Sequence, residues 1–136
     1  FYLKWLKMNK IYTEISVGEL IDKITILEIK KKKISDANSL VEINKEYSAL
    51  TDSLEKNIKL NDGLKKLWEE LKDVNIRLWD VEDGKRLAEK NKKFDQNFIE
   101  LARNVYKFND ERARIKSKIN ELSGSNIKEI KQHPKY

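Results

Sequence analysis

Apolar residues recur at every third or fourth position through four long stretches of the chain, and this repeat constrains the fold more than any other feature. The third stretch, for example, places Leu67, Leu71, Val74 and Leu78 at such intervals. Residues three and four apart lie on one face of an α-helix, so each stretch is predicted to form a helix with one apolar face. With only four glycines and one proline in 136 residues, helix breakers are scarce. The sequence therefore predicts an all-α fold.

Local signals set the limits of the first two predicted helices. Ser16, with Glu19 three residues later, has the spacing of a capping box, so Ser16 is the predicted N-cap of the first helix. The apolar repeat continues to the polar turn 35–38, and a second helix is predicted over residues 39–59. Residues 10–15 alternate like a short strand, but because no partner strand is evident, an extended lead-in is expected.

The third and fourth helices fill most of the remaining chain. The third helix is predicted to start near Leu64, and Gly84 is expected to kink it or end it early. Asp95 is the predicted N-cap of the fourth helix, which runs to about Leu122. Short connections make neighbouring helices antiparallel, which gives an antiparallel bundle of about four long helices. The predicted domain limits are 1–15 for an N-terminal arm, 16–122 for the bundle and 123–136 for a polar C-terminal tail.

Composition narrows the classes of function. The chain has no cysteine and a single histidine, His133, so thiolate metal sites and disulfides are excluded, and no metal or other cofactor is expected. No apolar run approaches the ~20 residues of a membrane span. The first residues lack the apolar core of a signal peptide, so a cytoplasmic protein is expected. Residues 1–7, which precede Met8, are interpreted as an upstream extension.

The net charge of +6 comes from 24 lysines and only five arginines, set against 23 acidic residues. The basic residues are spread around the predicted helices rather than gathered in one patch, which does not favour nucleic-acid binding. Arginine is the more informative cation, because lysine cannot replace its planar, five-donor guanidinium where two parallel hydrogen bonds are needed. All five arginines lie in the second half of the chain.

A second, polar stripe flanks the apolar face of three predicted helices. Arg112 interrupts the apolar repeat of the fourth helix, where a hydrophobic residue is expected. The stripe residues of the three helices are Asp22, Lys23, Thr25 and Lys30 on the first, Trp68, Asn75, Trp79, Glu82 and Arg86 on the third, and Arg103, Tyr106, Asn109, Asp110 and Arg112 on the fourth.

Three segments of the chain, residues 16–30, 78–83 and 98–120, resemble a family of short bacterial and phage proteins catalogued as a domain of unknown function. The start "VGELIDKIT" maps onto Val17 to Thr25, "LWDVED" onto Leu78 to Asp83, and "LARNVYKFNDERA" onto Leu101 to Ala113. The resemblance covers most of residues 14–122. It implies an all-helical fold and carries no assigned activity.

Two interpretations of Arg112 remain open. In the first, Arg112 forms a buried ion pair with Glu82 or Asp83, while Asn109 sets the register of the helices. In the second, the stripes converge on a site for a small anionic metabolite, with lysine and arginine holding the anion, Tyr106 and Trp79 as walls, and Glu82 or Asp110 as a candidate acid or base. The candidate ligand-binding residues are Lys23, Trp79, Glu82, Arg86, Arg103, Tyr106, Asn109, Asp110 and Arg112.

The best hypothesis is therefore a helical domain that binds a small anionic ligand, and the sequence leaves open whether it catalyses a reaction. The alternative is a non-enzymatic interaction or scaffold module whose polar cluster is a structural ion-pair network. Long amphipathic helices in a short chain leave an apolar stripe uncovered. A homodimer with coiled-coil-like packing is expected on that ground.

Overall fold

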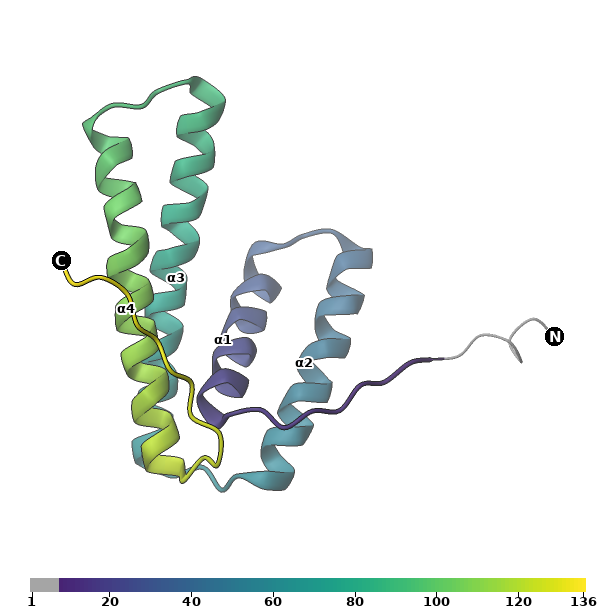
Figure 1. Ribbon diagram of the computed structural model, residues 1–136. Helices are drawn as coiled ribbons and strands as arrows, with labels where there is room; N and C mark the ends of the chain where they lie inside the picture. The colour runs from purple at the N-terminus through teal and green to yellow at the C-terminus, as the bar shows by residue number, and fades with distance from the viewer. Residues whose placement is uncertain (1–7) are drawn as a thin grey trace.

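The computed structural model describes residues 8–136, which form four α-helices and no strand (Figure 1). The helices are α1 (Val17–Lys33), α2 (Ala37–Asn57), α3 (Asp62–Asn91) and α4 (Gln96–Ser123). This confirms the all-α prediction with four helices. The upstream extension predicted over residues 1–7 lies outside the described part of the chain.

Side chains cap each helix at its N-terminus. The predicted caps Ser16 and Asp95 are confirmed, because their side chains accept hydrogen bonds from the backbone N–H groups of Glu19 (3.1 Å) and Phe98 (3.2 Å). α2 starts two residues earlier than predicted because the Asp36 carboxylate caps it, accepting from the N–H of Ser39 at 2.8 Å. N-terminal amides lack partners within a helix, so a cap fixes where the helix begins.

Gly84 neither kinks nor ends α3, so that expectation was wrong. The helix continues to Asn91 and ends only where Lys92 adopts a left-handed backbone conformation with φ of 54°. A Cβ atom at position 84 would lie 3.2 Å from two methyl carbons of Leu101 on α4. The missing side chain therefore lets α4 approach α3 closely, while the backbone hydrogen bonds of the helix continue unbroken.

α1 is the central element of the packing. It contacts α2, α3 and α4, whereas α3 and α4 form the most extensive helix pair of the molecule. The core includes Ile21 and Ile24 of α1, Leu54 of α2, Leu71 of α3 and Ile119 of α4, all of them buried. Helices that follow one another in the chain are antiparallel, as predicted (Figure 1). None of the helices within residues 8–136 is long and apolar enough to cross a bilayer.

The two hairpins of the fold differ in length. The α3–α4 hairpin extends well beyond the turn between α1 and α2, and nothing packs against its far end within the described chain (Figure 1). We call residues 82–106 the distal hairpin. After Ser123 the chain turns back and runs alongside α4, and residues 126–136 form what we call the C-terminal tail (Figure 1).

Candidate functional site

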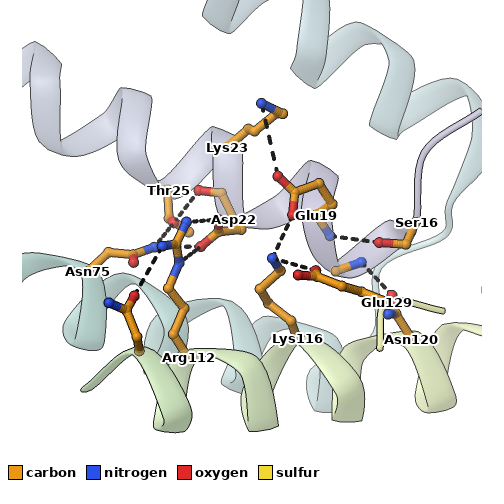
Figure 2. Close-up of polar contacts among 12 residues, drawn as sticks. Ser16, Glu19, Asp22, Lys23, Thr25, Asn75, Arg112, Lys116, Asn120 and Glu129 are labelled. Atoms are coloured by element: carbon orange, nitrogen blue, oxygen red, sulfur yellow. Dashed lines mark hydrogen bonds and ion pairs between the residues drawn. The ribbon is translucent and has the colours of Figure 1, made fainter. Parts of the chain in front are cut away.

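A row of polar contacts joins α1 to α4, at the place where an apolar interface would be expected in a helical core (Figure 2). Asp22 and Thr25 of α1 are completely buried, and Asn75 of α3 and Lys116 of α4 are also buried. We call this row the polar seam. A buried charge is costly unless it is paired and hydrogen-bonded, so the partners of each group decide what the seam does.

Arg112 forms a two-pronged ion pair with the buried carboxylate of Asp22. The Arg112 Nε donates to Asp22 Oδ1 at 2.9 Å, and its Nη2 donates to Asp22 Oδ2. Asn75 Nδ2 also donates to Asp22 Oδ1 and to Thr25 Oγ1, both at 2.9 Å (Figure 2). Hydrogen bonding to Asp22 raises the pKa of the Arg112 guanidinium. Asp22 therefore accepts three hydrogen bonds within the interface between three helices.

The predicted partner of Arg112 was wrong: it is Asp22 and not Glu82 or Asp83. In the antiparallel α3–α4 pair, Asn75 shares Asp22 as a partner with Arg112, while Glu82 lies seven residues further along α3. Seven helical residues span about 10 Å, which puts Glu82 two turns away from the guanidinium. Glu82 instead contacts Lys85 on its own helix at 3.5 Å. The predicted neighbour Asn109 does accept from Arg112 Nη1, at 3.4 Å.

Lys116, one turn beyond Arg112 on α4, continues the seam. Its Nζ atom contacts Glu19 of α1 at 2.5 Å and Glu129 of the C-terminal tail at 2.8 Å. Burial acts to lower the pKa of the Lys116 ammonium, but hydrogen bonds to Glu129 and Glu19 outweigh it and the pKa is raised. The Glu19 carboxylate thus contacts Lys116 and, at 4.0 Å, Lys23. Of the predicted capping box, the structure shows the hydrogen bond from the Glu19 N–H to Ser16 Oγ, while the Glu19 carboxylate contacts these lysines.

The N-terminus of α1 docks directly onto α4. The N–H of Gly18 donates to Asn120 Oδ1 at 2.7 Å, and the N–H of Val17 donates to Ser125 Oγ at 3.1 Å. A Cβ atom at Gly18 would lie 2.6 Å from the carbonyl oxygen of Lys116, so a larger residue does not fit. These amides, which in other helices bind anions, are already hydrogen-bonded to side chains of the same chain.

The buried polar groups of the seam all have partners within the chain. Within residues 8–136, every buried side-chain nitrogen and oxygen has a hydrogen-bond partner. This arrangement favours the ion-pair interpretation of Arg112 over one in which its guanidinium is reserved for a ligand. Interlocking polar groups of this kind fix the register of one helix against another.

The nine candidate ligand-binding residues do not converge on one point. Trp79, Glu82, Arg86 and Arg112 line a cavity of about 400 Å³ next to Ile26 and Ile29 of α1. Tyr106, Asn109, Asp110 and Arg112 line a second cavity, of about 1120 Å³, between α4 and the C-terminal tail. Lys23 and Arg103 line neither of these cavities and pair with Glu19 and Glu100. Arg112 is the one candidate residue shared by both cavities, and the nine-residue site remains a prediction.

Most seam residues were missing from the predicted site. Asp22, Thr25 and Asn75 had been placed only in the polar stripe, and Lys116, Asn120, Gly18 and Glu129 in neither. Lys116 and Asn120 follow Arg112 at four-residue intervals, so the helical repeat itself could have extended the polar stripe to them. The sequence offers no comparable signal for Gly18, which needs its partner helix to be placed, or for Glu129, which belongs to a segment without helical periodicity. Within residues 8–136, no cluster of three or more His, Asp or Glu side chains is arranged to hold a metal ion.

Asp110 anchors the C-terminal tail to α4. Its carboxylate accepts from the hydroxyl of Tyr136 at 2.8 Å and contacts Lys131 at 2.9 Å, and the ring of Tyr136 packs edge-on against Tyr106 with centroids 4.7 Å apart. Hydrogen bonds from Lys131 and Tyr136 hold the pKa of Asp110 below its usual value. The hydrogen bond to Asp110 raises the pKa of the Tyr136 hydroxyl.

We expect the tail to leave α4 in acid. Because the pKa of Asp110 is lower in the docked state, docking is favoured above the free pKa of a carboxylate. That contribution is lost as the pH falls through the lowered value, below 3.8. Tyr106, Lys131 and His133 also face this carboxylate. NMR spectra of the Tyr136 ring recorded between pH 7 and pH 2 should show it released before the helices unfold. Release at the free carboxylate pKa or above would contradict the contact.

Comparison with known proteins gives a family and no activity. A family model described as "Family of unknown function (DUF6165)" matches residues 11–135. No curated protein and no solved structure matches the chain. Function is therefore to be argued from the geometry.

Proposed function

The chain belongs to the family of unknown function DUF6165, and we propose that it acts as a helical interaction module that pairs with a second copy of itself through the distal hairpin. In this proposal the polar seam is structural. It fixes α1 against α4 and so holds the α3–α4 hairpin at a defined angle, projecting from the rest of the fold (Figure 1).

One observation carries the proposal: none of residues 82–106 is buried, although this stretch carries large apolar side chains on both of its helices. Leu87, Phe94 and Ile99 are 58%, 53% and 47% exposed. Phe98 and Leu101 are only partly covered, because two helices side by side share a single line of contact. By contrast, the base of the same hairpin buries Leu71 and Ile119 completely against α1.

A helical hairpin of this kind is marginal by itself. Most of the stability of a protein helix comes from packing its apolar face, and short helices without such packing are only marginally stable in water. Covering exposed apolar surface stabilises a protein by about 25 cal/mol of free energy for each Å² removed from water. The distal hairpin therefore gains stability when a partner covers its exposed apolar side chains.

Charge supports a second copy as that partner. The distal hairpin carries six basic and five acidic residues, whereas the whole chain has a net charge of +6. Two copies can therefore approach through this segment without the repulsion that basic surfaces would produce. A two-fold axis would bring the same surface of each copy together, and two paired hairpins would form a four-helix, coiled-coil-like bundle.

We expect the protein to sediment as a dimer, and the double variant Leu87→Gln/Ile99→Gln to sediment as a monomer. Both residues are exposed on helices, so glutamine should keep each helix while removing apolar contact area. The control is Val41→Gln on α2, which removes an apolar side chain that is 64% exposed but lies outside the distal hairpin, and it should remain dimeric. A wild-type protein that stays monomeric at the highest workable concentration would refute the proposal.

A further inference from the structure

The cavity between α4 and the C-terminal tail is strongly basic for its size. Four cations line it, Arg112 and Lys116 of α4 and Lys131 and Lys135 of the tail, together with His133. The carboxylates that line it are Asp110 and Glu129. A volume of about 1120 Å³ is ample for a small molecule, although the cavity is open along the tail.

Glu129 differs from the other carboxylates around these cations. Asp22 and Glu19 belong to α1 and pair with Arg112 and Lys116 from the core side, and Asp110 belongs to α4. Glu129 comes from the tail, in which every residue is exposed, and its own side chain is 52% exposed. It is thus the second carboxylate on an ammonium group that Glu19 already balances.

Glu129 is one of only two carboxylates that line the cavity, and the other is Asp110. When Glu129 leaves, Lys116 keeps Glu19 alone, a carboxylate that also contacts Lys23 at 4.0 Å. The cavity then holds four cations and one lining carboxylate. An external anion that enters takes the place of Glu129, so the exchange replaces one charge-assisted contact of Lys116 with another. The Glu129 side chain is 52% exposed, so water screens its contact with the buried Lys116. The contact is therefore weaker than an ion pair buried on both sides.

From this geometry we propose that the cavity binds a small carboxylate or phosphate anion at Lys116, and that Glu129 occupies the same position in the unliganded protein as an internal competitor. Tyr106 and the aliphatic side chain of Val105 border the cavity and can contact the body of such a ligand. Lys131 and Lys135 line the cavity from the tail. The cavity shares Val105 and Tyr106 with the distal hairpin, but the four cations that would hold the anion lie outside residues 82–106, so their contacts with it do not require the pairing of two copies.

The test is a titration of the whole protein with inorganic phosphate and, separately, with succinate, followed by NMR shifts of the backbone amides in residues 110–117 and 127–136. Glu129→Gln should bind the anion about threefold more tightly than wild type, because the internal competitor loses its charge. Glu121→Gln is the matched control. It removes the same charge from an exposed position on α4 that does not line the cavity, and it should leave the affinity unchanged.

The outcomes separate cleanly. Saturable shifts confined to these two segments, lost in Lys116→Met and weakened in Lys135→Gln, would support the site. Tighter binding of phosphate than of succinate, or the reverse, would then identify the ligand as a phosphate or as a carboxylate. Equal gains in Glu129→Gln and Glu121→Gln would show general charge attraction and overturn the proposal. So would the absence of shifts in Glu129→Gln at the highest anion concentration used. A monomeric protein with normal anion binding would overturn the pairing proposal alone.

Discussion

Gly18→Ala should destabilise the protein by about 3 kcal/mol, the largest effect we expect from the smallest change in the chain. A methyl group at this position would lie 2.6 Å from the carbonyl oxygen of Lys116 and 2.9 Å from Asn120 Oδ1. The first contact is with backbone, which cannot turn away as a side chain can. The second is with the acceptor of the Gly18 N–H, so relief of the clash would also lengthen a buried hydrogen bond.

Urea unfolding followed by circular dichroism measures this effect directly. Gly63→Ala is the matched control. Its new methyl group would meet the end of the half-exposed Leu122 side chain at 2.9 Å, and that side chain can move. Its other neighbour, Asn61 Oδ1, would lie 3.4 Å away, which is an ordinary contact distance. Gly63 lies in the first turn of α3, where alanine is the better helix former, so we expect its stability to change by less than about 1 kcal/mol. Equal effects at Gly18 and Gly63 would contradict the docking of α1 onto α4.

Asp22→Asn should cost about 2–3 kcal/mol, because it leaves the guanidinium of Arg112 without a counter-charge inside the helix interface. Asp22 is completely buried, whereas the Arg112 side chain is 28% exposed, so water at its outer side should moderate the loss. The asparagine amide can still accept one of the hydrogen bonds that now reach the carboxylate. We therefore place the expected cost below that of an ion pair buried on both sides.

A double-mutant cycle with Arg112→Met tests whether the two residues act as a pair. If they do, the double variant should be more stable than the sum of the single losses predicts, by about 2 kcal/mol. If the two losses in unfolding free energy simply add, the Asp22–Arg112 contact contributes nothing to stability. That result would contradict the structural role of the polar seam. Asp36→Asn, at the exposed N-cap of α2, changes a carboxylate to the same amide outside the seam and controls for the chemistry of the substitution.

The sequence predicted what depends on neighbours along the chain. The helices follow from apolar spacing. Ser16 and Asp95 could be identified as caps because a cap acts on an amide three residues away. The polar stripe of α3 was also placed correctly on one face, since Asn75 reaches Asp22 and Trp68 Nε1 donates to Glu28 of α1 at 2.8 Å.

The sequence could not supply what depends on how separate helices slide and turn against each other. In a helical bundle, Arg112 could pair with Asp22, Glu82 or Asp83. Only the register of α4 against α1 and α3 selects Asp22. Glu19 was expected to complete its own capping box, yet it contacts Lys116, which is 97 residues away. Glycine has a low helix propensity, which is why Gly84 was expected to interrupt α3. In the structure, Leu101 of α4 packs closely against Gly84, and this contact explains the glycine.

The proposal of self-association rests on the distal hairpin having no core of its own, and hydrogen exchange of its amides tests that claim most directly. Exchange should be measured for residues 82–106 over a wide range of protein concentration, with the α1 amides around Ile21 and Ile24 as an internal reference. We predict that protection of the hairpin rises with concentration while that of α1 stays constant, because a second copy supplies the missing core. Protection that is independent of concentration would contradict the account.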